Sequence, residues 1–184
     1  QPDKPRGRGN KVLPSPVKAF ATEKNLPVLQ PVKVKAPEVV AELKNFRADL
    51  IVVVAFGQIL SQEILDLPKF GCINVHASLL PKYRGAAPIE WSIINGEKIT
   101  GITTMKMNAG LDTGDMLVKR EIAIDEDMIL PELRENLMQL GSEALIETID
   151  KLVGGTLERH KQDDSLSNYA PMLKKETGLI DLEK

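Results

Sequence analysis

Two polar residues in an otherwise apolar stretch have types and spacing that could do chemistry. Asn74 and His76 alternate with Ile73 and Val75. Successive side chains of a β-strand point to opposite faces, so Asn74 and His76 share one face, about 6.5 Å apart along the strand. A histidine side chain titrates near neutral pH and can act as a general acid or base, and an amide donor beside it can stabilise an oxyanion. The alternative is that both residues only make hydrogen bonds inside the core.

Such a pair also needs a carboxylate that orients the imidazole, and Asp112 is the leading candidate. It lies between Gly110 and Gly114 in a turn that separates two predicted strands. Glycine-rich turns let the backbone approach a ligand closely, and functional residues often occupy such loops. Asp112 would otherwise serve only to form the turn.

Other kinds of site find little support in the sequence. His76 and His160 are far apart, and no cluster of histidine, cysteine and carboxylate residues has the spacing of a metal site, so we expect no metal. Cys72 and His76 would lie roughly 13 Å apart along a strand, too far for a nucleophile and its base, so we expect Cys72 to be buried and unreactive. The glycine fingerprints of dinucleotide and P-loop sites are absent from the sequence, which disfavours an oxidoreductase.

The elements that must position these residues alternate between strand and helix. This order predicts an α/β domain with a mostly parallel central sheet flanked by helices. The β-branched run at residues 49–55 predicts a central strand covered on both faces. Four prolines predict a loop at residues 1–16. We expect the other strands at residues 28–30, 72–76, 100–107, 116–124 and 157–161, and helices at residues 17–24, 38–46, 61–67, 88–95 and 129–153.

Composition is that of a globular protein, with 42% hydrophobic and 27% charged residues in a chain of 184. The charge is uneven, because residues 1–47 hold ten Lys/Arg against four Asp/Glu. The basic end therefore either meets a polyanion or forms a solvated surface. A single cysteine excludes an internal disulfide and fits a reducing compartment. No segment approaches the roughly 18 apolar residues that span a bilayer.

Residues 74–88 and 101–115 resemble the two characteristic motifs of the folate-dependent formyltransferase family. The resemblance implies a Rossmann-like domain that uses 10-formyltetrahydrofolate as formyl donor and co-substrate, without a metal. It also implies a catalytic triad of Asn74, His76 and Asp112. In this reading an amine attacks the formyl carbon, Asn74 and protonated His76 stabilise the oxyanion, and Asp112 holds His76 and helps to move the proton.

A segment inside the first motif, just after His76, resembles the part of family members that lines the folate pocket. It comprises Ser78, Leu79, Leu80 and Pro81. The alternative is that Leu79 and Leu80 are ordinary core residues, and both descriptions can hold together.

The acceptor is indicated by residues 1–18, which resemble the inserted loop of the methionyl-tRNA formyltransferase branch of the family. This implies initiator methionyl-tRNA as partner, in translation initiation, with Arg8 and Lys11 contacting the RNA. Three alternatives stay open. The acceptor is a small amine such as glycinamide ribonucleotide or an amino sugar, the chain is a folate- or RNA-binding fragment without turnover, or the basic loop is only solvated.

The resemblance also divides the chain into parts. We expect a basic Pro/Gly-rich loop at residues 1–18, a catalytic domain at 19–170, and the start of a linker to a further C-terminal domain at 171–184. Family members begin with a strand and a helix that would precede Gln1, so we expect the chain to be truncated at both ends. The expected location is the bacterial cytoplasm or an organellar matrix, with no membrane and no obligate protein partner.

Overall fold

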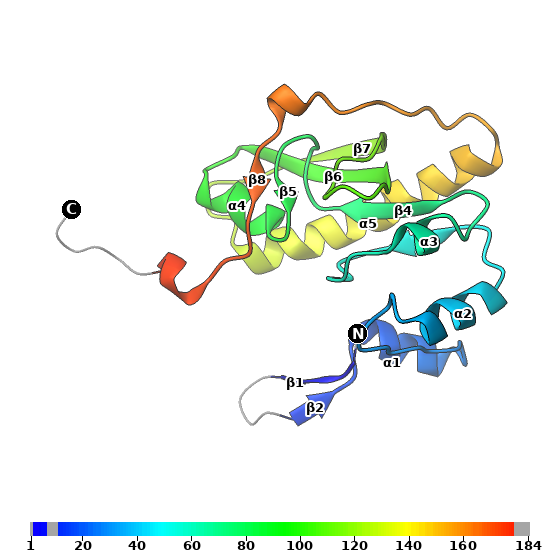
Figure 1. The fold of residues 1–184 in the computed structure, drawn as a ribbon. Coiled ribbons are helices and arrows are strands. Elements are labelled where there is room, and N and C mark those ends of the chain that lie inside the picture. Colours follow the sequence, from blue (N-terminus) through cyan, green and yellow to red (C-terminus); the bar gives the residue numbers. More distant parts are fainter. Residues whose placement is uncertain (1, 7–10, 179–184) are drawn as a thin grey trace. The chain divides into compact units, whose positions relative to one another are not determined.

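The computed structural model describes residues 2–6 and 11–178 (Figure 1). Contacts divide the chain into two units, which are described separately. The first unit contains residues 1–47 and 58–60, and the second contains residues 48–57 and 61–184.

The first unit begins with a two-stranded antiparallel ribbon of β1 (Lys4–Arg6) and β2 (Lys11–Leu13). The expectation of a loop throughout residues 1–16 is therefore wrong. Pro5 is compatible with β1 because a two-stranded ribbon consists of edge strands, where a missing N–H is tolerated. The predicted strand at residues 28–30 is also wrong: Pro27 and Pro31 flank it, and neither has an N–H to donate.

Two helices follow in the first unit, α1 (Pro16–Glu23) and α2 (Pro37–Asn45), close to their predicted ranges. Each begins with a proline, whose missing N–H has no intrahelical partner in the first turn anyway. The Asp3 carboxylate ties the ribbon to the rest of the unit, since it accepts hydrogen bonds from Lys18 Nζ at 2.6 Å and Gln30 Nε2 at 2.8 Å.

The second unit is built on a four-stranded sheet with the order β3-β4-β6-β7. Only β3 and β4 are parallel, and the other two pairs are antiparallel. The sheet is thus mixed, and the expectation of a mostly parallel sheet is wrong. One reason is that the turn at residues 107–115 joins β6 directly to β7, and strands joined by a short turn run antiparallel. The strands are β3 (Ile51–Val53), β4 (Cys72–His76), β6 (Ile99–Lys106) and β7 (Met116–Ala123).

Strand β3 differs from its prediction in position. It lies at one end of the described strand order and not at the centre, and Val52 and Val54 are 38% and 58% exposed. A β-branched run favours extended backbone, but it does not determine which neighbours the strand will have.

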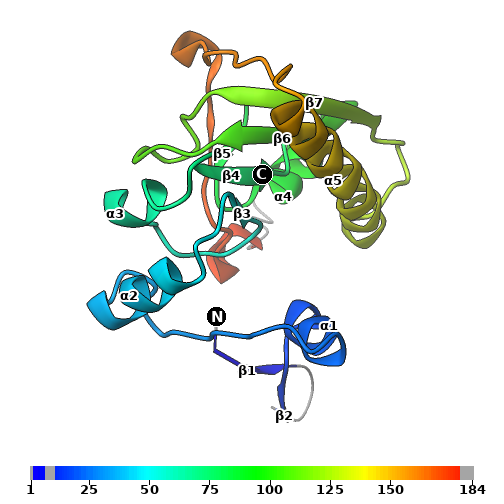
Figure 2. The same cartoon turned by 90° about the vertical axis from the view of Figure 1, so that its right-hand side faces the viewer.

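Helix α5 (Leu130–Val153) covers one face of the sheet, as the two views in Figure 1 and Figure 2 show. Its buried Leu133, Leu137 and Ala144 pack with Ile102 of β6 and Val118 of β7. This interface holds β6 and β7, and β6 pairs in turn with β4, on which Asn74 and His76 lie. In the described part of the chain, no helix has both the length and the apolar character needed to cross a membrane.

Smaller elements complete the second unit. The predicted strand at residues 157–161 is reduced to a single bridge between His160 and Met116, because only His160 exchanges backbone hydrogen bonds there. Further along, β8 pairs in parallel with β5 and returns the chain toward residues 84–85. The elements are α3 (Gln62–Leu65), β5 (Arg84–Gly85), α4 (Pro88–Ile94), η1 (Asp164–Leu166), β8 (Tyr169–Ala170) and η2 (Lys175–Gly178).

Candidate active site

The structure brings Asn74, His76 and Asp112 together. Asn74 and His76 lie on β4, and both face the Asp112 carboxylate, which comes from the turn between β6 and β7. Asn74 Nδ2 is 3.5 Å from Asp112 Oδ1, and His76 Nδ1 is 3.8 Å from Asp112 Oδ2. Both distances exceed those of strong hydrogen bonds. Catalytic hydrogen bonds are often long without substrate and tighten in the reacting complex.

The imidazole of His76 is fixed by a backbone group. His76 Nε2 lies 2.9 Å from the carbonyl oxygen of Tyr83. A carbonyl can only accept, so Nε2 carries a proton, and Nδ1 is the nitrogen that faces Asp112. His76 is 5% exposed, so this orientation is set by the interior of the protein.

The carboxylate of Asp112 is held by a backbone donor. The N–H of Gly85 donates to Asp112 Oδ2 at 2.9 Å. Gly85 has φ of 118°, and a Cβ there would lie 2.7 Å from the carbonyl oxygen of Ala170, so only glycine fits. Asp112 itself has φ of 52°, a left-handed conformation that is uncommon outside glycine. Strained residues of this kind are concentrated at functional sites.

Tyr83, whose carbonyl meets His76, is anchored at its other end. Its hydroxyl donates to Glu97 Oε1 at 2.7 Å and accepts from Asn95 Nδ2 at 3.0 Å, while its backbone N–H donates to Asn168 Oδ1. The hydrogen bond from Tyr83 lowers the pKa of the Glu97 carboxyl. Burial, followed by the contact with Glu97, raises the pKa of the Tyr83 hydroxyl. At neutral pH the Tyr83 hydroxyl therefore keeps its proton and the Glu97 carboxyl is ionised, and these are the states that favour this contact.

We expect Tyr83→Phe to lower the free energy of unfolding by about 1–2 kcal/mol at pH 7, because a hydrogen bond to a charged partner is lost. The folded-state pKa of Glu97 lies below its ordinary 4.5, so the contact contributes fully to the free energy of unfolding above pH 4.5. The difference between wild type and variant should then shrink as the pH falls through the folded-state pKa of Glu97. Urea denaturation from pH 7 to pH 3 measures it, with Tyr169→Phe at a 62% exposed tyrosine as the control. A constant difference would contradict the assignment.

The segment predicted to meet folate follows β4 directly. The side chains of Ser78 and Leu80 are fully buried, whereas Leu79 and Pro81 are partly exposed. Thr103 Oγ1 bridges the segment, since it donates to the Ser78 carbonyl at 2.7 Å and accepts from the Leu80 N–H at 3.1 Å. The interior therefore fixes the path of the backbone and leaves Leu79 and Pro81 as the side chains nearest to solvent.

Lys119 of β7 supports the same segment. Its Nζ donates to the Leu80 carbonyl at 2.5 Å. Burial lowers the pKa of the Lys119 ammonium group. The chain thus uses the ammonium group of a lysine to hold a backbone carbonyl beside β4.

The residues predicted to contact RNA are described only in part. Arg8 lies outside the described residues, and Lys11 begins β2.

Cys72 is 1% exposed, and burial raises the pKa of its thiol to about 11, so a thiolate is disfavoured there. Among residues 2–6 and 11–178, no group of three or more histidine, cysteine and acidic side chains is arranged to hold a metal ion.

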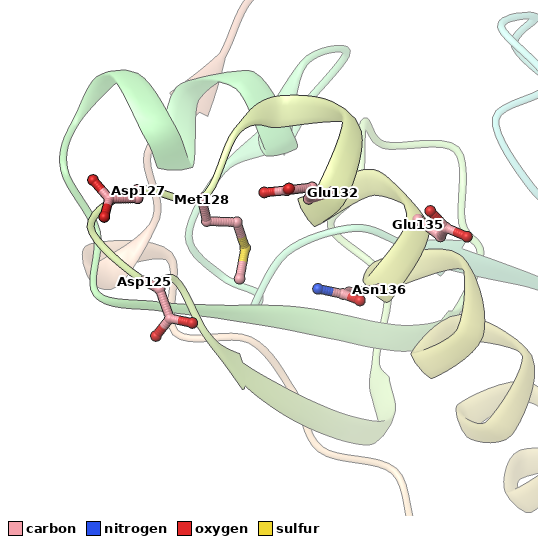
Figure 3. Close-up of a pocket in the computed structure, with 6 residues that line it drawn as sticks. All are labelled: Asp125, Asp127, Met128, Glu132, Glu135 and Asn136. Atoms are coloured by element: carbon pink, nitrogen blue, oxygen red, sulfur yellow. The ribbon is translucent and has the colours of Figure 1, made fainter.

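A separate hollow lies at the start of α5. Figure 3 shows Asp125, Asp127, Glu132 and Glu135 around it, with their carboxylates spread apart. Acidic side chains at a helix N-terminus interact favourably with the helix dipole. Glu132 also accepts a hydrogen bond from the Ile129 N–H at 3.2 Å. This contact assigns Glu132 to the capping of α5.

Three groups at the site were not predicted from the sequence: the N–H of Gly85, the carbonyl of Tyr83 and the side chain of Gln162. Gly85 and Tyr83 lie within the first motif, but as backbone groups they leave no mark of their own on a sequence. Gln162 donates to the backbone carbonyls of Asp112 and Gly114, each at 2.8 Å. Nothing in the residue pattern around Gln162 distinguishes it from an ordinary loop residue.

Comparison with known proteins places this chain in a family. A family model described as Formyl transferase matches residues 1–149. The chain belongs to the formyl transferase family. This confirms the resemblance drawn from residues 74–88 and 101–115.

Two relatives and one solved structure show which members of the formyl transferase family this chain is similar to. It is 64% identical, over 98% of its length, to the methionyl-tRNA formyltransferase of Geobacter metallireducens, and 57% identical over its whole length to that of Ruminiclostridium cellulolyticum. The chain spans 58% and 59% of the length of these relatives. Phosphoribosylglycinamide formyltransferase from Bacillus halodurans superposes with a TM-score of 0.68 at 26% identity, covering 74% of each chain.

Structures with lower identity share the fold. HypX from Aquifex aeolicus, solved in complex with tetrahydrofolic acid, superposes with a TM-score of 0.70 at 20% identity, covering 81% of this chain and 26% of that one. The α/β formyltransferase fold is therefore established, with a mixed sheet in place of the mostly parallel one that was expected.

Proposed function

We propose that this chain carries the formyl transfer step of a methionyl-tRNA formyltransferase, from 10-formyltetrahydrofolate to the amino group of initiator methionyl-tRNA. The observation that carries the proposal is 64% identity, over nearly the whole chain, to a relative of that name. The convergence of Asn74 and His76 on the Asp112 carboxylate supports it, because acyl transfer needs an oxyanion donor beside a proton-transfer group.

The proposed chemistry assigns one task to each side chain. The acceptor amine attacks the formyl carbon of the donor, and the formyl oxygen becomes an oxyanion. The Asn74 amide and protonated His76 stabilise that oxyanion. The bond from the formyl carbon to the folate nitrogen then breaks, and the amine proton passes to that nitrogen with the help of Asp112, directly or through water.

Two fixed elements support these roles. The Tyr83 carbonyl, 2.9 Å from His76 Nε2, keeps the imidazole in one orientation. The Gly85 N–H, 2.9 Å from Asp112 Oδ2, keeps the carboxylate beside it. Preorganised groups of this kind need not reorganise at the moment of reaction, which is where electrostatic catalysis gains its advantage. For the donor, we propose the segment Ser78, Leu79, Leu80 and Pro81 as a wall of the folate site.

A parallel assay tests the proposal. Full-length protein is given 10-formyltetrahydrofolate with either methionyl-tRNA or glycinamide ribonucleotide. We expect formyl-methionyl-tRNA as the product and none with His76→Ala, while His160→Ala, at a histidine whose side chain is 59% exposed, stays active. Transfer to the small amine alone would overturn the acceptor assignment, and binding of both substrates without transfer would overturn the enzymatic one.

We expect Arg8→Ala to weaken tRNA binding and to reduce the salt dependence of that binding. Each phosphate contact that is lost lowers the slope of log K against log salt by about 1. Filter binding at several salt concentrations measures the slope, with Lys11→Ala expected to behave in the same way. Arg159→Ala, outside the basic segment at residues 1–18, serves as the control. An unchanged slope in both Arg8→Ala and Lys11→Ala would mean that this segment is only a solvated surface.

A further inference from the structure

The side chain of Gln162 joins two backbone positions of the turn that carries Asp112. Its Nε2 lies 2.8 Å from the carbonyl oxygen of Asp112 and 2.8 Å from that of Gly114. A side-chain amide nitrogen has two hydrogens, so these two contacts use its full donor capacity. Gln162 is 50 residues beyond Asp112 in the sequence, and it belongs to the segment between the His160 bridge and η1.

The other end of the same amide is fixed by Arg84. Arg84 Nε donates to Gln162 Oε1 at 2.9 Å, and a second guanidinium nitrogen donates to Asp164 at 2.7 Å. A guanidinium only donates, so the amide oxygen must face Arg84 and the amide nitrogen must face the two carbonyls. The hydrogen-bond network therefore permits a single orientation of Gln162.

Gln162 and Gly85 hold the same residue by different atoms. Gln162 holds the backbone of Asp112, whereas the Gly85 N–H, adjacent in sequence to Arg84, holds its carboxylate at 2.9 Å. Asp112 has φ of 52°, a conformation that persists in a non-glycine residue only where the surroundings enforce it. Without the two amide contacts, the turn is free to relax and to move the carboxylate away from His76.

We propose that Gln162 is a positioning residue for formyl transfer, which holds Asp112 in its left-handed conformation and its carboxylate beside His76 and Asn74. The inference rests on the proposed function, in which Asp112 orients His76. Gln162 touches neither substrate in this role and acts only through Asp112. A residue that only stabilised the fold would not affect kcat in this way. The effect of Gln162 on kcat must depend on the Asp112 carboxylate.

Gln162→Glu separates the two roles in the full-length protein. The new carboxylate keeps the size of the side chain and the contact with Arg84, but it cannot donate to the two carbonyls. We expect kcat to fall about 10²-fold, because a displacement near 1 Å has such an effect on reaction geometry. KM for both substrates should change less than about threefold, since binding surfaces are untouched. Gln139→Glu on the exposed face of α5 should leave kcat unchanged.

A double-mutant cycle tests whether the effect passes through Asp112. In an Asp112→Asn background, Gln162→Glu should lower kcat by no more than about twofold further, because residues that act as a unit are non-additive. A full 10²-fold further loss in that background would overturn the proposal, as would wild-type kcat in the single variant.

A readout that needs no activity keeps the inference separate from the proposed function. The amide proton resonance of Gly85 reports the hydrogen bond to Asp112. We expect it to shift upfield in Gln162→Glu as that bond lengthens, while Gln139→Glu leaves it in place. An unchanged Gly85 resonance would overturn the positioning role. If the wild type transferred no formyl group, the proposed function would fail, and the Gly85 resonance would still decide whether Gln162 holds Asp112.

Discussion

Asn74→Ala should lower kcat for formyl transfer by about 10²–10³-fold while the protein stays folded. Removal of one oxyanion donor has this effect in other acyl-transfer enzymes and corresponds to about 3–4 kcal/mol of transition-state stabilisation. The backbone of Asn74 pairs with Met105 through β4 and β6, and that pairing does not involve the side chain. Stability should therefore change little, and donor binding should persist.

Single-turnover kinetics with saturating donor measures this effect apart from binding. Asn136→Ala, at an exposed asparagine of α5, is a matched control that should retain wild-type kcat. Asn74→Asp should be as slow as Asn74→Ala, because it removes the amide donor and puts a second carboxylate 3.5 Å from Asp112 Oδ1. A loss of less than tenfold in Asn74→Ala would remove this residue from the oxyanion site.

Gly114→Ala should produce the largest loss of stability. A Cβ on Gly114 would lie 1.7 Å from the carbonyl oxygen of Lys106, a backbone atom that no side-chain rotation can move. Lys106 also donates its N–H to the Asp115 carbonyl at 2.8 Å, at the start of the β6–β7 pairing. The variant must therefore separate the end of β6 from the start of β7. We expect the free energy of unfolding to fall by about 3 kcal/mol, the upper part of the usual range for overpacking.

Urea denaturation at constant m-value measures the loss. Gly178→Ala is the control, because a Cβ there meets no atom within 4 Å. Activity of Gly114→Ala should also be low under conditions where it remains folded, since Gly114 lies two residues from Asp112. A midpoint equal to that of Gly178→Ala would show that the turn adapts easily.

The elements around the site could be predicted where local pattern determines them. Strand β4 was predicted to the residue, because apolar and polar side chains alternate through it and the chain turns on either side. Helix α5 was predicted to within one residue at its start, from Pro131 in the first turn and Gly154-Gly155 after the end. That Asn74 and His76 lie on one face of β4 follows from the period of two in a strand.

The rest could not be read from local pattern. Strand β6 runs antiparallel to β4 because of the path that the chain takes through α4 and the following turn. The alternation of helices and strands in the sequence does not specify that direction. The Tyr83 carbonyl and the Gly85 N–H are backbone groups, and all residues except proline possess both. Gln162 acquires its partners only through pairing of β5 with β8 and of Met116 with His160. Such contacts between distant segments are a property of the fold and not of any short window of sequence.

The return of residues 160–170 to β5 has a consequence for the order in which the protein matures. Residues 72–123 can form β4, β6 and β7 as soon as they leave the ribosome, since their contacts join segments that are close in sequence. The partners of Arg84 and of Asp112 at Gln162 are synthesised later, and contacts of long sequence separation form slowly. A nascent chain would thus pair β4, β6 and β7 before Gln162 could hold the backbone of Asp112.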